Sequence, residues 1–275
     1  MLPTTLAAVA LALLAGPVVA ADQIVLAVNF SDAPLGTYTA DAFLADWHVA
    51  PRESAGLTDD RLAIVVDPLE TTRHVLRVTY RAGRIGGGSA MTFNVPLAGY
   101  HDDLWLQYRL MFPDDFTWVK GGKLPGFGGG DTPTGCIADG GFDGFTTRLM
   151  WREGGQAFSY LYFPGKVARC GDYAPLYVQF QKGRWHTVVQ HVRLNDPGQA
   201  NGTLEQYVDG VKVLALTQQT WRLQAKVSID SIKMDTFFGG STPNWAPLTD
   251  QFLYLGAFRV WSGGAPVEAT ASSSR

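Results

Sequence analysis

Alternation of side chains along residues 104–112 is the feature that most constrains the fold. Every second residue is apolar, and this apolar set consists of Leu104, Leu106, Tyr108, Leu110 and Phe112. Gln107 and Arg109 fall between them. Successive side chains of a β-strand point to opposite sides, so a period of two predicts a half-buried strand.

Further strand patterns recur along the chain. Strands are expected at residues 24–30, 74–80, 145–151, 157–163, 176–180, 185–194, 204–208, 211–216 and 252–261. Asp209-Gly210 separates two of them and predicts a tight hairpin, because both central positions of a type I′ turn need positive φ. With 31 glycines, 15 prolines and almost no helical periodicity, we expect an all-β protein. Its natural form is a β-jelly roll sandwich of two antiparallel sheets, with a substrate cleft on the concave face.

The charge balance restricts the partners. The chain has 22 basic and 25 acidic residues, a net charge of −3, and no basic run. Nucleic-acid binders usually carry a basic surplus, so no nucleic-acid partner is expected. We expect a monomer.

The first 20 residues are typical of an export signal. The apolar run at residues 6–14 is too short to span a bilayer, and Val18 and Ala20 form a small-residue cleavage pattern. No Lys or Arg precedes the run, and a membrane anchor is the alternative interpretation. We therefore predict a signal peptide at 1–20, a secreted domain at 21–262 without a membrane segment, and a flexible tail at 263–275.

Cys136 and Cys170 are the only cysteines. In an oxidising compartment two cysteines most simply form one disulfide, and that pairing is predicted here. No His or Cys partners at metal-binding spacing lie near them.

Two predicted strands carry candidate functional residues on one face. Residues 145–152 place Thr146 and Arg148 on one side and an apolar set on the other, which consists of Phe145, Leu149 and Trp151. The chain turns at Gly154-Gly155 and returns with Tyr160 and Tyr162 on a shared face. An antiparallel hairpin would bring Arg148 to the two tyrosines. Ordinary packing of an arginine over tyrosine rings is the alternative interpretation.

A glycine-rich segment lies upstream, at residues 118–130. It contains Lys120 and Lys123, and it is not a phosphate-binding loop, because Leu124 follows the second lysine where Ser or Thr is needed. The two lysines are an odd number of positions apart, so their side chains would point to opposite faces of an extended strand and only one would face a cleft. Two solvated lysines are the alternative.

These segments resemble polysaccharide lyase family 14, which acts on alginate and related glucuronate polymers. The resemblance extends over residues 24–262 and is carried by VKGGKLPGFGGG, FTTRLMWR and FSYLYFP. It implies a β-jelly roll and four catalytic residues, which are Lys123, Arg148, Tyr160 and Tyr162. Thr146 stands where the family usually has serine, and its methyl group is expected to narrow a subsite. Further substrate contacts are expected from Lys120, His186 and Gln190, the last two sharing strand parity.

The implied reaction explains these residue types. A uronate lyase removes the C5 proton beside the carboxylate and expels the 4-linked sugar oxygen, and Lys123 and Arg148 suit the charge that develops. Nearby cations are expected to lower a tyrosine pKa from about 10. We assign Tyr162 as base or acid and Tyr160 as the orienting residue. The reverse order, and Lys123 as the base, remain open.

Other functions have weaker support. A glycoside hydrolase needs paired carboxylates, and the chain has no ExDxxE pattern. The histidines lack zinc-ligand spacing. We expect no metal ion and no cofactor. A non-catalytic lectin of the same fold is the main competitor to the lyase.

Overall fold

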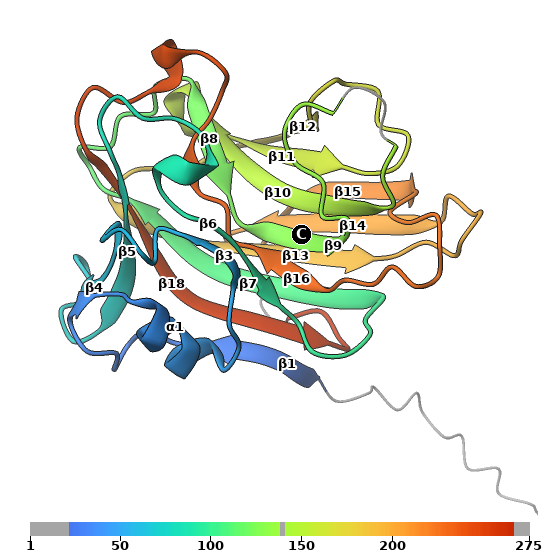
Figure 1. The fold of residues 1–275 in the computed structure, drawn as a ribbon, viewed down its shortest axis with the longest axis horizontal. Coiled ribbons are helices and arrows are strands. Elements are labelled where there is room, and N and C mark those ends of the chain that lie inside the picture. Colours follow the sequence, from blue (N-terminus) through green and yellow to red (C-terminus); the bar gives the residue numbers. More distant parts are fainter. Residues whose placement is uncertain (1–21, 138–140, 267–275) are drawn as a thin grey trace, which may run out of the picture.

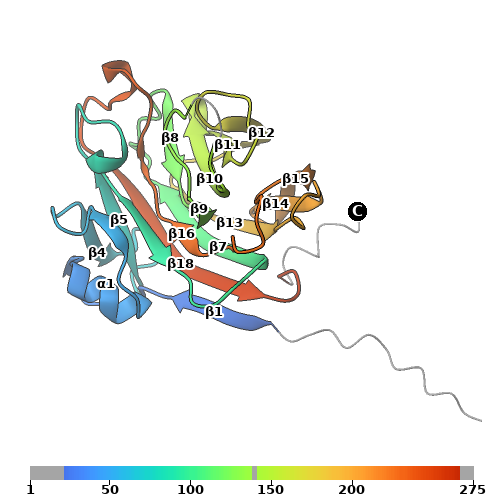
Figure 2. The same cartoon turned by 45° about the vertical axis from the view of Figure 1, so that its right-hand side comes forward.

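Two antiparallel sheets packed face to face make up the structure, a computed structural model that describes residues 22–137 and 141–266. The predicted signal peptide lies outside the described residues, as does most of the predicted tail. Figure 1 shows the two layers, and Figure 2 shows them from a second direction. Both sheets have nine strands within the described residues.

The first sheet, sheet A, contains most of the predicted strands. In spatial order these are β15 (Val211–Gln219), β14 (Gly202–Val208), β13 (Arg184–Arg193), β7 (Asp103–Phe112), β18 (Gln251–Ser262), β5 (His74–Tyr80), β4 (Leu62–Val66) and β2 (Gly36–Thr37), with β1 (Gln23–Val28) beside β18. Asp209 and Gly210 join β14 to β15 with φ of 51° and 79°, so the predicted hairpin turn is confirmed.

The second sheet, sheet B, carries the candidate site. Its order is β12 (Asp172–Gln179), β11 (Gln156–Tyr162), β10 (Gly144–Arg152), β9 (Gly126–Gly130), β16 (Ser231–Lys233), β6 (Thr92–Pro96) and β3 (Arg52–Ala55). β8 (Gly121–Leu124) pairs with β10 and with β17 (Phe237–Phe238). Short 3₁₀ turns lie at Gly87–Ser89, Glu153–Gly155 and Pro243–Trp245.

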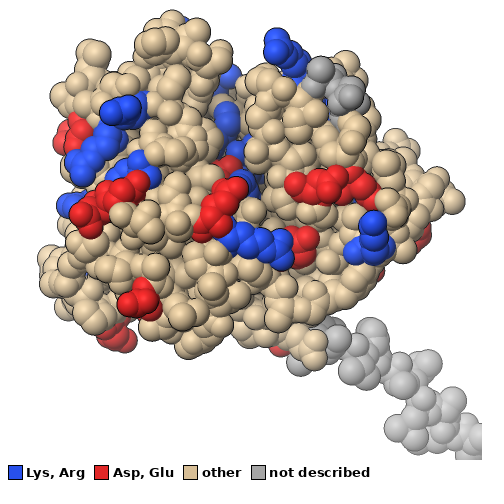
Figure 3. All heavy atoms as spheres, viewed as in Figure 1, with Lys and Arg blue, Asp and Glu red and all other residues tan. Residues whose placement is uncertain are grey.

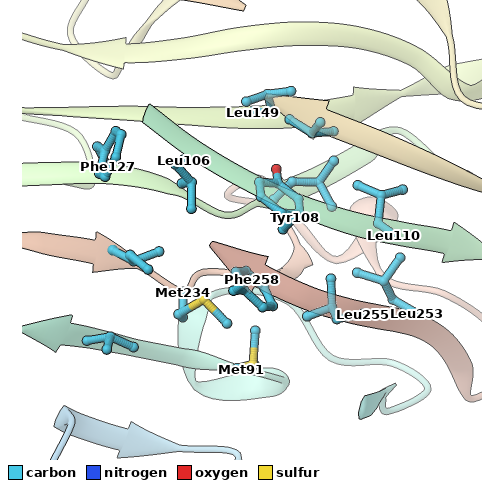
Figure 4. Packing of buried hydrophobic residues seen from close by; sticks show 14 of the residues in the cluster. Met91, Leu106, Tyr108, Leu110, Phe127, Leu149, Met234, Leu253, Leu255 and Phe258 are labelled. Atoms are coloured by element: carbon cyan, nitrogen blue, oxygen red, sulfur yellow. The ribbon is translucent and has the colours of Figure 1, made fainter. Parts of the chain in front are cut away.

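The core fills the space between the sheets, as Figure 4 shows for residues of both layers. Leu106, Tyr108 and Leu110 of β7 are fully buried there, so the predicted alternation is confirmed. Trp105 lies on the outer side of β7 yet is also buried, because it stacks on His191 at 3.9 Å between ring centroids.

A short helix, α1 (Ala40–Trp47), joins the two layers at one end. The Thr39 side chain caps it by accepting from the amide of Ala42. Phe43 contacts Phe93 of sheet B at 5.2 Å, and Trp47 contacts Phe258 of sheet A at 5.4 Å between ring centroids. The sequence analysis did not predict this helix. No helix among the described residues is long and apolar enough to cross a bilayer.

Strand β10 separates the core from the candidate site. Phe145, Leu149 and Trp151 point into the core, as predicted, and are fully buried. Arg148 and Met150 point to the opposite side. Gly122 allows β8 to approach the Trp151 ring closely, since a Cβ at Gly122 would lie 2.2 Å from that ring.

We predict that Leu149→Ala destabilises the fold by about 2–5 kcal/mol, because it leaves a cavity behind the site. Leu248→Ala is the matched control, since that leucine is 96% exposed, and it should change the free energy of unfolding by less than about 0.5 kcal/mol. Urea unfolding of the two variants measures both. Similar losses in the two would contradict this description of the core.

Candidate active site

The outer face of sheet B is hollowed by a cavity of about 530 Å³. Figure 3 shows this face with Lys and Arg atoms gathered inside the hollow. Four predicted catalytic residues line it, namely Lys123, Arg148, Tyr160 and Tyr162. Their predicted convergence is therefore confirmed, while their chemical roles stay predictions.

Strand register explains the convergence. Arg148 of β10 pairs with Tyr160 of β11, and Thr146 pairs with Tyr162. On the other side of β10, Met150 pairs with Lys123 of β8. Because paired residues on antiparallel strands point to the same face, the cation and both phenols come together. The Arg148 guanidinium carbon lies 5.4 and 5.5 Å from the two tyrosine ring centroids.

The Lys123 amine is buried among groups that would solvate an ammonium charge poorly. Its residue is 8% exposed, and its Nζ lies 4.0 Å from the Tyr160 ring centroid. The hydrogen bond it donates, at 3.1 Å, goes to the Met150 thioether, a weak acceptor. Burial, and then the charge of Arg148, holds the pKa of Lys123 well below the 10.5 of an ordinary lysine. The neutral amine, a possible base, is thereby favoured.

Arg148 is held by a buried carboxylate. Its Nη1 donates to Asp235 Oδ2 at 2.5 Å, and both side chains are 2% exposed. The other oxygen of Asp235 lies 3.4 Å from the Lys233 ammonium, which is 3.7 Å from Glu53. Nε of Arg148 is buried without a hydrogen-bond partner among the described residues. The guanidinium therefore has donor capacity left for an anionic ligand.

The two tyrosine hydroxyls bond each other at 3.0 Å. Tyr162 also donates to the Gly135 carbonyl at 2.5 Å, and Tyr160 accepts from the Gly171 amide at 3.0 Å. Burial, followed by the bond with Tyr160, raises the pKa of Tyr162 above its ordinary 10.0, although Arg148 acts in the opposite direction. The cation lowers this pKa, as expected, but burial outweighs it, so the expected net lowering is wrong.

The predicted disulfide between Cys136 and Cys170 is confirmed. Their Cα atoms are 4.0 Å apart, and both residues line the cavity. The bridge thus lies at the mouth of the site rather than at a distance from it.

Four predicted substrate contacts lie outside the cavity and are corrected here. Thr146 is fully buried, and its hydroxyl donates to the Pro133 carbonyl at 3.1 Å, so its methyl group narrows no subsite. Lys120 lies in the turn before β8 and does not line the hollow. His186 and Gln190 share parity, as expected, but their face of β13 is the interior one.

Both interior residues have protein partners. His186 accepts from the amide of Gln181 at 2.8 Å through Nε2. Gln190 accepts from the Thr147 hydroxyl at 2.9 Å. They lie between the sheets, behind the site, because even-numbered residues of β13 face sheet B.

Several residues of the cavity were not predicted from the sequence. Lys233 lies across the sheet from Arg148, with Gly126 between them. Lys233 pairs with Gly126, and a Cβ added to Gly126 would lie only 2.7 Å from the Arg148 Cα. On the other side Tyr160 pairs with Tyr173. Burial raises the pKa of Tyr173 to about 12. Trp245, Asp235 and Glu53 also line the cavity and were not predicted. The alternation of polar and apolar residues over 231–235 was a usable signal for two of them.

The family model described as Polysaccharide lyase 14 matches residues 68–258. The chain belongs to polysaccharide lyase family 14. Exolysin of Paramecium bursaria Chlorella virus 1 is 26% identical over 182 residues. The match covers 54% of this chain but only 28% of exolysin, so the chain spans less than a third of that relative.

Solved structures of similar fold include lyases of uronate polymers. A variant of alginate lyase Aly36B with an alginate tetrasaccharide has a TM-score of 0.74 and 22% identity, over 86% of this chain and 95% of that one. The alginate lyase of Aplysia kurodai has a TM-score of 0.69 and 22% identity, over 86% and 98%. The endo-β-1,4-glucuronan lyase of Trichoderma reesei has a TM-score of 0.52 and 12% identity, over 88% and 96%. These likenesses confirm the expected jelly-roll fold of this family 14 protein.

No group of three or more His, Cys, Asp or Glu side chains within residues 22–137 and 141–266 is arranged to hold a metal ion.

We predict that Asp235→Ala destabilises the protein by about 3–5 kcal/mol, because it leaves two buried cations without their carboxylate. Glu70→Ala is the control, since its ion pair with Arg73 is exposed, and it should cost no more than about 1 kcal/mol. Urea unfolding at neutral pH compares the two. Equal effects would contradict the assignment of Asp235 as the buried counterion of the site.

Proposed function

We propose that the protein is a polysaccharide lyase that cleaves 4-linked polyuronates of the alginate and glucuronan class by β-elimination, after export from the cell. One observation carries the proposal. A lysine amine with a lowered pKa is buried beside an arginine and two phenols, in a cavity open to solvent.

Arg148 is the group suited to bind the uronate carboxylate. Its position is fixed by Asp235, and its Nε has no other partner among the described residues. A guanidinium can bind a carboxylate through two parallel hydrogen bonds. Its charge also stabilises the dianion that forms when C5 loses its proton.

Lys123 is the group suited to remove the C5 proton. The lowered pKa favours the neutral amine, and the amine lies within the same cavity as Arg148. The C5–H bond breaks, its electron pair forms the C4–C5 double bond, and the C4–O4 bond breaks. The proton passes to the amine of Lys123, which becomes an ammonium.

The leaving O4 oxygen needs a proton, and a tyrosine hydroxyl can donate one. A hydroxyl has one hydrogen, and that of Tyr162 is directed at the Gly135 carbonyl, so in their mutual bond Tyr160 donates to Tyr162. Tyr162 is fully buried, whereas Tyr160 is 5% exposed and covers the Lys123 amine. We assign Tyr160 as the acid and Tyr162 as its orienting partner. When O4 is bound, the Tyr160 hydroxyl turns its hydrogen from Tyr162 to O4, its O–H bond breaks, and a bond between this hydrogen and O4 forms. Afterwards the Lys123 ammonium returns a proton to the tyrosinate.

The polyuronate substrate is supported by charge and by the comparisons. Lys233 adds a second buried cation across the sheet from Arg148, which suits a chain with a carboxylate on each sugar. The alginate tetrasaccharide bound to the Aly36B variant supports the same class of polymer. Two aromatic side chains that line the cavity and lie beside Arg152, Tyr173 and Trp245, offer surfaces for sugar rings.

The test is a panel of polyuronates rich in mannuronate, guluronate or glucuronate, with ultraviolet absorbance of the new C4–C5 double bond as the readout. We expect turnover of at least one polymer. Lys123→Met should lower kcat by about 10²–10⁴-fold, because it removes the base. Lys120→Met is the matched control, from the turn that precedes β8, and it should keep the wild-type rate. Binding of a polyuronate without any turnover would contradict the lyase and favour the lectin.

The pH profile provides a second prediction. The base must be deprotonated, so kcat/KM should rise with pH through the lowered pKa of Lys123, well below 10.5. Tyr162, the partner that orients Tyr160, must keep its proton, and its raised pKa should prevent it from adding a falling limb below pH 10.0. Initial rates across a pH series measure both limbs. A rising limb at the pKa of an ordinary lysine would be inconsistent with this role of Lys123.

A further inference from the structure

Two peptide groups beside the disulfide hold the hydroxyls of the active-site tyrosines. Gly135 directly precedes the first cysteine, and its carbonyl accepts from the Tyr162 hydroxyl at 2.5 Å. Gly171 directly follows the second cysteine, and its amide donates to the Tyr160 hydroxyl at 3.0 Å. The disulfide therefore joins the two backbone segments that contact the proton-donating pair.

These segments, residues 133–137 and 168–171, are called the clasp here. Gly171 packs directly on both rings, since a Cβ there would lie 2.6 Å from the Cε2 atoms of Tyr160 and of Tyr162. Neither clasp segment belongs to a strand, and no ladder joins the two within the described residues. Side-chain and covalent ties must therefore hold the clasp together.

Two side chains assist the disulfide. Lys166 is 7% exposed, and its Nζ donates to the carbonyl of Ile137 at 2.9 Å and to that of Ala168 at 2.7 Å, one on each clasp segment. Thr146 ties the first segment to β10 through the Pro133 carbonyl. The disulfide is the covalent link between the segments, and Cys136 is exposed to solvent.

We propose that the Cys136–Cys170 disulfide is a positioning element of the active site: it keeps the clasp closed on Tyr160 and Tyr162, and proton transfer to the leaving oxygen depends on it. The proposal rests on the proposed lyase function. A catalytic donor must be held within about 0.5 Å of its productive place, and a misplacement of about 1 Å can cost about 10²-fold in rate. The tyrosine rings are fixed by strand β11, but their hydroxyl partners belong to the clasp.

Reduction of the bridge is the first test. Dithiothreitol supplies two electrons and two protons, the S–S bond breaks, two thiols form, and the reagent closes to its own cyclic disulfide. We expect kcat to fall by about 10–10²-fold with a smaller change in KM, and to recover on reoxidation. The double variant Cys136→Ser, Cys170→Ser should show the same loss without recovery. Near-ultraviolet circular dichroism follows the fold throughout.

Gly171→Ala is the second test, because it leaves the disulfide intact. The added Cβ would push the clasp off both rings, and we expect a loss of kcat similar to that on reduction. Gly88→Ala is the matched control, since a Cβ there meets nothing within 4 Å, and it should keep the wild-type kcat.

Tyrosine ionisation supplies a readout independent of turnover. Opening the clasp admits water to Tyr162, so its raised pKa should fall toward 10.0, and tyrosinate absorbance should begin at lower pH. The Tyr162→Phe protein should show no such change on reduction. If no polyuronate is cleaved by the oxidised enzyme, the lyase proposal fails, and this titration still tests the clasp.

Three results would overturn the proposal. They are unchanged kcat and unchanged tyrosine titration after reduction, wild-type kcat in Gly171→Ala, and global unfolding on reduction, which would make the disulfide a requirement of the fold instead.

Discussion

The site depends on the pairing of β10 with β11 while one face of β10 is buried in the core. Leu149 and Trp151 fix which side of the strand points inward, and a shift by one residue would turn them to solvent. The same register sets Arg148 opposite Tyr160. The core thus determines where the charged residues of the outer face meet, and the glycines of β8 and β9 let neighbouring backbone approach closely enough to complete that face.

Burial, more than any single contact, sets the chemistry of the cavity. It lowers the pKa of Lys123 and raises that of Tyr162, so each group is driven to its neutral form. A neutral amine can accept the C5 proton, and a neutral Tyr162 keeps the hydrogen bonds to Gly135 and Tyr160 that position the Tyr160 hydroxyl. Asp235 keeps Arg148 in place without neutralising the whole cluster, because Lys233 shares the same carboxylate.

Much of the fold and the central site residues could be predicted from the sequence, since period-two patterns and family motifs are local signals. Strands β8 and β9 were not predicted, because glycine has a low strand propensity. Their glycines are required by the close approach of neighbouring strands, which the local sequence does not show. His186 and Gln190 show what alternation along a strand cannot predict. It places both residues on one face of the strand, but it does not say which face is interior. The tyrosine pKa was misjudged because burial cannot be read from charge neighbours alone. Asp235 was missed because it meets Arg148 only through the pairing of distant segments.

The central claim is that burial and the charge of Arg148 hold the pKa of Lys123 well below that of an ordinary lysine, and the most direct test is a nuclear magnetic resonance titration of the lysine side chains. The signal of Lys123 is identified by its loss in Lys123→Arg. The account predicts that this amine titrates well below 10.5 and below the exposed lysines of the same protein. Titration of Lys123 together with the exposed lysines would contradict it, and the base of the reaction would then have to be another group.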